Sequence, residues 1–153
     1  MDQDESPALK AARGRRADLH QALVDLEHAL AAPAPKRTDE WAAQARHALA
    51  SVSEAFDAHI EVTEGPHGLY EEVLEQAPHL AHALDKLRHE HTEITAAIVD
   101  VRSRLDESGS DADAWVSQIR EAATTALGHL VRHRQQGADL VYEAYQVEIG
   151  GET

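Results

Sequence analysis

The chain has 153 residues and a formal net charge of −14, and it contains 11 histidines and no cysteine. The acidic charge excludes nucleic acid as a partner, because phosphate backbones would be repelled, and the lack of cysteine leaves nitrogen and oxygen as the ligands for any metal. No segment resembles a signal peptide or reaches the roughly 20 apolar residues of a membrane span, so we expect a cytoplasmic protein without a membrane partner.

Apolar residues recur every three or four positions over four long stretches, which predicts four amphipathic helices in a single domain spanning 1–153. The first helix is expected to begin at Ser6 and Pro7, a capping hydroxyl followed by proline, and to end in the proline-containing stretch 31–37. Residues 1–6 are expected to be frayed. Its core face is predicted to contain Leu9, Ala12, Arg16, Leu19, Leu23, Leu26 and Leu30.

The second helix is expected to begin with Thr38 or Asp39 as its cap. Two glycines and a proline should end it at 64–68, and a short helix is predicted over 69–76. Its core face is predicted to contain Trp41, Ala45, Ala48, Val52, Ala55, His59 and Val62.

The third helix should follow Pro78, and the fourth should run from a cap at Ser110 or Asp111 to about residue 147, with 148–153 frayed. Short connections between four such helices predict an all-α fold, an antiparallel up-down-up-down four-helix bundle. The core face of the third helix contains Leu80, Leu84, Leu87, His91, Ile94, Ile98, Val101 and Leu105, and that of the fourth contains Ile119, Ala123, Ala126, Leu130, His133, Gly137, Leu140 and Ala144.

Three of these faces carry a histidine in mid-helix: His59, His91 and His133. A buried imidazole without a partner costs about 1–3 kcal/mol. Metal binding would account for all three, because side chains from facing helices of a bundle can converge on one ion. His20 and His129 flank the core faces of their helices, so each is a candidate for a further ligand.

A metal-free interpretation stays open, in which the three histidines bond to one another or to buried water in a structural or protein-interaction bundle. A zinc-stabilised bundle is a further alternative. The chain has no nucleophile elbow, Walker loop or His-Glu-x-x-His pair, so the residues do not decide whether it is an enzyme.

The order of these residues resembles the hemerythrin-like family, also called HHE cation-binding domains, over nearly the whole chain. The resemblance lies in one histidine on each predicted helix and in acidic or aromatic neighbours: His20, His59 with Glu64, Glu90 with His91, and His133 before Leu140, Val141 and Tyr142. It implies a four-helix bundle that holds non-haem iron and that binds or senses O2, peroxide or NO.

The family also implies a bridging carboxylate four residues after the histidines of the second and fourth helices, where this chain has Thr63 and Gly137. Two iron ions need anionic bridges, so one metal held by the histidines and Glu64 fits the ligands better than two. A nitrogen-rich site with few anions would also accept zinc. The leading hypothesis is an iron site, mononuclear or dinuclear, formed by His20, His59, Glu64, His91, His129 and His133.

Overall fold

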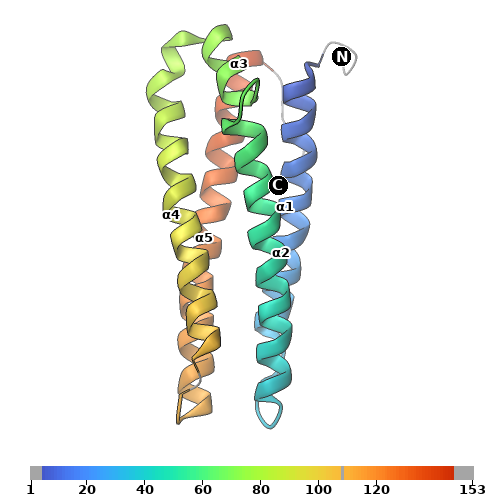
Figure 1. The fold of residues 1–153 in the computed structure, drawn as a ribbon, viewed down its shortest axis with the longest axis vertical. Coiled ribbons are helices and arrows are strands. Elements are labelled where there is room, and N and C mark those ends of the chain that lie inside the picture. The colour runs from blue at the N-terminus through green and yellow to red at the C-terminus, as the bar shows by residue number, and fades with distance from the viewer. Residues whose placement is uncertain (1–4, 108, 147–153) are drawn as a thin grey trace.

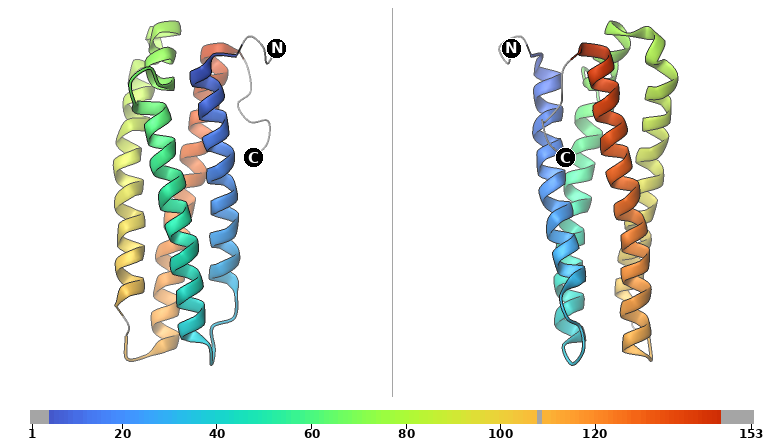
Figure 2. Two further views of the ribbon diagram at one scale, coloured as in Figure 1. Left: turned by 45° about the vertical axis from the view of Figure 1, so that its right-hand side comes forward. Right: turned by 180° about the vertical axis from the view of Figure 1, so that it is seen from behind.

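The computed structural model describes residues 5–107 and 109–146 and shows a bundle of helices, with no strand among the described residues (Figure 1). The elements are α1 (Pro7–Ala31), α2 (Thr38–Glu64), α3 (Leu69–Gln76), the 3-10 turn η2 (Pro78–Leu80), α4 (Ala81–Asp106) and α5 (Ala112–Tyr145). The prediction of an all-α helical bundle is confirmed. In Figures 1 and 2 successive long helices run in opposite directions, and α1 packs against α2 while α4 packs against α5.

The helix ends follow the expected chemistry at two of three predicted caps. The Ser6 hydroxyl accepts a hydrogen bond from the Leu9 amide at 3.1 Å, and Asp111 accepts one from the Ala114 amide at 3.2 Å. The prediction for α2 was wrong, because Arg37 occupies the cap position and makes no side-chain cap bond. Thr38 is already helical, and its hydroxyl donates back to the Ala34 carbonyl at 3.4 Å.

The predicted frayed ends fall largely outside the described residues, which exclude 1–4 and 147–153. At the start of the chain, Ser6 is held by its capping bond and Glu5 pairs with Arg13 at 2.6 Å. None of the described helices is both long and apolar enough to cross a membrane.

A tight turn separates α2 from α3 and folds the short helix over one end of the bundle. His67 adopts a left-handed backbone conformation with φ of 61°, and the Gly68 amide donates to the Gly65 carbonyl at 2.9 Å. The predicted break at 64–68 and the predicted helix over 69–76 are both confirmed. The turn thereby places α3 against α2, α1 and α5.

The apolar core is divided into two clusters. The larger cluster includes Leu19, Phe56, Ile94 and Leu130, and the smaller one, at the α3 end, includes Ala12, Leu87 and Leu140. Between them, each long helix contributes at least one polar side chain to the interior: Arg16, His59, His91 and His133. A polar layer therefore crosses the bundle between the two apolar clusters.

Candidate metal centre

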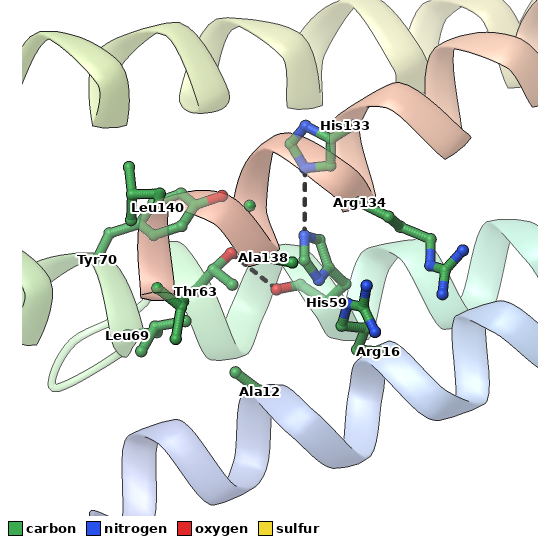
Figure 3. A pocket seen from close by; sticks show the side chains of 12 residues that line it. Ala12, Arg16, His59, Thr63, Leu69, Tyr70, His133, Arg134, Ala138 and Leu140 are labelled. Atoms are coloured by element: carbon green, nitrogen blue, oxygen red, sulfur yellow. Dashed lines mark hydrogen bonds between the residues drawn. The ribbon is translucent and has the colours of Figure 1, made fainter. Parts of the chain in front are cut away.

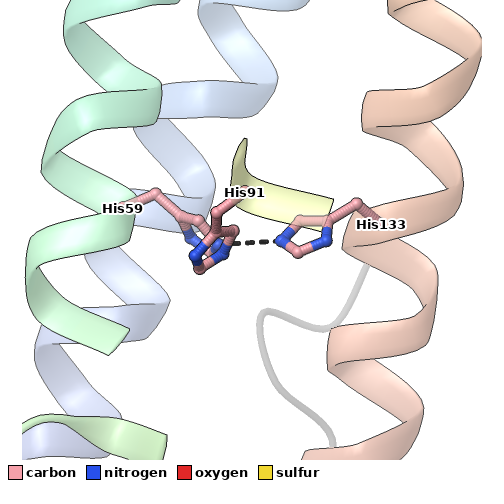
Figure 4. A group of neighbouring side chains, drawn as sticks. All are labelled: His59, His91 and His133. Carbon is pink, nitrogen blue, oxygen red and sulfur yellow. Dashed lines mark hydrogen bonds between the residues drawn. The ribbon is translucent and has the colours of Figure 1, made fainter. Parts of the chain in front are cut away.

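Three helices each direct one histidine into this polar layer. His59 of α2, His91 of α4 and His133 of α5 offer ring nitrogens that all lie within 4.8 Å of one another, and Figure 4 shows the rings converging from separate helices. His91 and His133 are each 2 % exposed, and His59 is partly buried. Within the described part of the chain, this histidine cluster is the one group with the spacing of metal ligands.

Two of the rings are held by carboxylates on their outer nitrogens. His91 Nδ1 donates to Glu64, and His133 Nδ1 donates to Glu90 Oε1 at 2.7 Å. A carboxylate at this position keeps the proton on Nδ1 and leaves a lone pair on Nε2, which is the usual arrangement of a metal-binding histidine. Both rings are therefore in the tautomer that a metal requires at Nε2.

The inner nitrogens of the cluster also have partners, at longer distances than the carboxylates on the outer nitrogens. His59 Nε2 and His133 Nε2 lie 3.3 Å apart, and the Tyr70 hydroxyl lies 3.3 Å from His91 Nε2. Because the Nε2 atoms of His91 and His133 carry lone pairs, Tyr70 and His59 are the donors in these contacts. Phe56 packs against all three imidazoles, with ring centroids 5.5 to 6.0 Å from theirs.

Burial keeps the three imidazoles neutral. It lowers the pKa of His91 to about 3, with further contributions from His133 and Arg88. It also lowers the pKa of His59 well below 6.5, and the neighbouring histidines and arginines add to this effect. Burial lowers the pKa of His133 as well, although Glu90 offsets part of the change. Neutral imidazole is the form that binds a metal, so the protonation state of the three rings at neutral pH is compatible with metal binding.

A small cavity adjoins the histidine cluster on the side of α1. Its volume is about 30 Å³, and its polar lining includes His59, His133, Tyr70, Arg16 and Arg134 (Figure 3). Arg16 and Arg134 are buried, at 8 % and 9 % exposure. The remaining lining comes from Thr63 and from apolar or small residues: Ala12, Leu69, Gly137, Ala138, Leu140 and Val141.

The structure brings together three of the six predicted site residues. His59, His91 and His133 form the cluster, whereas Glu64 contacts the outer nitrogen of His91 and is one of its supports. His20 is partly buried on α1 and lies outside the cluster, and His129 is exposed beside Arg132. The α1 residue at the level of the cluster is Arg16, one turn before His20.

The sequence did not identify four residues of the site. Arg16, Arg134 and Tyr70 line the cavity beside the histidines, and Glu90 holds the His133 ring. Arg16 did carry a signal, because it was a charged residue on an otherwise apolar core face. The sequence carried no such signal for Arg134 and Tyr70, because their side chains point inward only as a result of the way that α5 and α3 pack.

Comparison of the chain with protein-family models, with curated proteins and with solved structures finds no match. The function is therefore inferred from the geometry of the site and from the sequence pattern.

The donor set fits a metal ion. Two nitrogens bound to one ion at about 2.1 Å lie roughly 3.0 to 3.4 Å apart for octahedral to tetrahedral angles. The 3.3 Å between His59 Nε2 and His133 Nε2 falls in this range. The widest pair in the cluster, at up to 4.8 Å, would have to close by a rotation of a side chain.

Proposed function

We propose that this chain is a hemerythrin-like metal-binding protein that holds one non-haem iron ion with His59, His91 and His133, and that it binds or senses O2, peroxide or NO. The observation that carries the proposal is the convergence of three neutral imidazoles, two of them held by carboxylates through Nδ1. A structural core does not require this arrangement, because three buried polar rings cost more free energy than three leucines.

A mononuclear centre is favoured over a dinuclear one by the residues around the cluster. Thr63 and Gly137, at the positions where the family resemblance implies bridging carboxylates, both line the small cavity. The Thr63 hydroxyl donates to the His59 carbonyl at 2.8 Å, and Glu64 is directed to His91 Nδ1. None of the residues lining this cavity is an acid that could bridge two ions.

Iron held by these three nitrogens would supply open coordination positions for a diatomic molecule or peroxide, and a one-electron couple for their reduction. The chain supplies the surroundings. Phe56 packs against the three rings, the two apolar clusters lie on either side of them, and Glu64 and Glu90 fix the direction of two rings. Tyr70 places a hydroxyl beside His91 Nε2, and burial raises its pKa, so it stays a donor at neutral pH.

The contact between His59 and His133 at 3.3 Å also suits a second candidate, a metal-free bundle in which the rings bond to one another. The experiment that separates the candidates uses protein purified without an affinity tag. Iron(II) under anaerobic conditions and zinc(II) are titrated calorimetrically, and the absorption spectrum is recorded before and after peroxide. The wild type is compared with His91→Leu and with His89→Leu, an exposed histidine on the same helix.

We expect one bound metal per chain in the wild type and in His89→Leu, with a loss of at least a hundredfold in affinity in His91→Leu. A spectral change on addition of peroxide to the iron form supports the proposed ligand. Metal binding without such a change supports the zinc-stabilised bundle instead. A failure to bind either metal, together with unchanged or higher thermal stability of His91→Leu, would overturn the proposal in favour of the metal-free bundle.

A further inference from the structure

One nitrogen of the histidine cluster lacks the support that its neighbours have. His91 Nδ1 and His133 Nδ1 each have a glutamate, but His59 Nδ1 is buried without a hydrogen-bond partner among the described residues. Ring nitrogens of metal-binding histidines are almost always hydrogen-bonded on the outer side. The site is therefore incomplete at His59.

Metal binding would change the proton position on this ring alone. In the metal-free arrangement His59 Nε2 donates to the lone pair of His133 Nε2, so His59 Nδ1 carries its own lone pair. A metal at Nε2 would require the opposite tautomer of His59, with the proton on Nδ1. His91 and His133 already have their protons on Nδ1 and need no change. Loading the site thus creates one buried N–H group at His59 that needs an acceptor.

The surroundings of His59 suit an acceptor with a negative charge. His59 lines the small cavity together with Arg16 and Arg134, and no aspartate or glutamate lines it. Figure 3 shows the Arg16 guanidinium directed toward the ring of His59. The positive charges of both arginines help to lower the pKa of His59. A guanidinium has five N–H donors, so each arginine can bind an anion while it keeps other partners.

The cavity has room for a small ion. A water molecule needs a cavity of roughly 10–15 Å³, so a cavity of about 30 Å³ accepts about two or three non-hydrogen atoms. Gly137 contributes to this space, since a Cβ there would have no atom within 4 Å.

We propose that this cavity binds a small oxyanion of the size of formate, which accepts a hydrogen bond from His59 Nδ1 and pairs with Arg16 and Arg134. The inference rests on the proposed metal site, because the metal places the proton on Nδ1. Coupling between two sites is reciprocal, so the anion strengthens metal binding and the metal strengthens anion binding.

The test measures zinc(II) affinity by calorimetry at pH 7.5 with and without sodium formate. Ionic strength is held constant with the sodium salt of HEPES, whose sulfonate is too large for the cavity. The wild type is compared with Arg16→Met, which removes the cavity charge, and with Arg15→Met, which removes an exposed charge from the adjacent position of α1. Arg134→Met is a second cavity variant if Arg16→Met does not fold.

We expect formate to tighten zinc binding about five- to tenfold in the wild type and in Arg15→Met, and to have no effect in Arg16→Met or Arg134→Met. In the reciprocal titration, formate should bind the zinc-loaded protein more tightly than the zinc-free protein by the same factor. Zinc affinity that is independent of formate in the wild type would overturn the anion site without contradicting the metal site. A formate effect that persists in both arginine variants would place the anion elsewhere and also overturn the inference. If zinc does not bind with or without formate, the metal site fails and the anion site fails with it.

Discussion

At the scale of single residues, two glutamates determine how the histidine cluster can act. Glu64 and Glu90 each accept from an Nδ1 atom, and their side chains are 32 % and 19 % exposed. They therefore keep part of their hydration while they orient buried rings. The cost of burying a charge is largely avoided, and the direction of the rings is still fixed.

Replacing Glu90 by glutamine tests this support. The amide keeps the shape of the side chain but accepts a weaker hydrogen bond than a carboxylate, so His133 Nε2 becomes a poorer ligand. We expect zinc affinity to fall about 10- to 100-fold in calorimetry, with an unchanged helical circular dichroism spectrum. Glu93→Gln, an exposed position on the same helix, serves as the control and should match the wild type. Equal affinities in the two variants would contradict a role for Glu90 in holding the ring.

The three clustered histidines could be predicted from the sequence because each replaces an apolar residue at a regular position of its helix. Their partners could not. Glu90 is adjacent to His91 in the chain, yet it contacts His133, because neighbouring residues on a helix point about 100° apart. His20 lies outside the cluster for a related reason, since the loop 32–37 sets the level of α1 against α2 and brings Arg16 to the cluster.

At the scale of elements, the turn between α2 and α3 determines where Tyr70 lies relative to the histidine cluster. Tyr70 is the second residue of α3, and its hydroxyl reaches His91 only if the turn places the helix correctly. A Cβ on Gly68 would lie 2.7 Å from the Gly65 carbonyl oxygen and 2.9 Å from those of Thr63 and Val62. These are backbone atoms, so the contact cannot be relieved by a side-chain rotation.

Gly68→Ala is therefore expected to destabilise the protein by about 1–3 kcal/mol in urea unfolding, the usual range for added bulk at a crowded position. Gly14→Ala provides the contrast. Gly14 is exposed inside α1, and a Cβ there meets no atom within 4 Å. Alanine is the better helix former, so this variant should be more stable than the wild type by about 0.5–1 kcal/mol. Equal effects of the two substitutions would contradict the close packing of the turn.

The elements themselves could largely be predicted, because glycine and proline mark their ends clearly in this chain. The break at 64–68 and the helix over 69–76 follow from residue types alone. The cap of α2 could not be predicted this way, because Thr38 uses its hydroxyl for the Ala34 carbonyl in the preceding loop.

At the scale of the whole molecule, the polar layer interrupts a core that is otherwise formed by apolar residues of the four long helices and of α3. The all-α bundle could be predicted because the three- and four-residue spacing of apolar positions runs through all four long helices. The assembly of the layer could not, since it depends on the relative heights of helices that are distant in the chain. The layer makes the stability of the whole bundle dependent on pH.

The metal-free protein should lose stability as the pH falls below 6.5. In the unfolded chain each histidine takes up a proton near pH 6.5, whereas burial lowers the pKa of His59, His91 and His133 in the folded state, for His91 to about 3. The unfolded state therefore binds more protons than the folded state between these values, so this contribution to stability is complete above pH 6.5 and is lost progressively below it.

For each histidine that stays neutral in the folded state, the free energy of unfolding falls by up to about 1.4 kcal/mol for every pH unit below 6.5. Urea unfolding at pH 7.5, 6.5, 5.8 and 5.0 measures this slope before most carboxylates begin to titrate. His91→Leu removes one such group and should show a shallower slope, while His89→Leu, which changes an exposed imidazole, should keep nearly that of the wild type. A wild-type stability that does not change over this range would mean that the rings are protonated as easily in the folded protein as in the unfolded one. Saturating zinc should steepen the decline, because metal bound only by the folded protein adds stability that protons compete away as the pH falls.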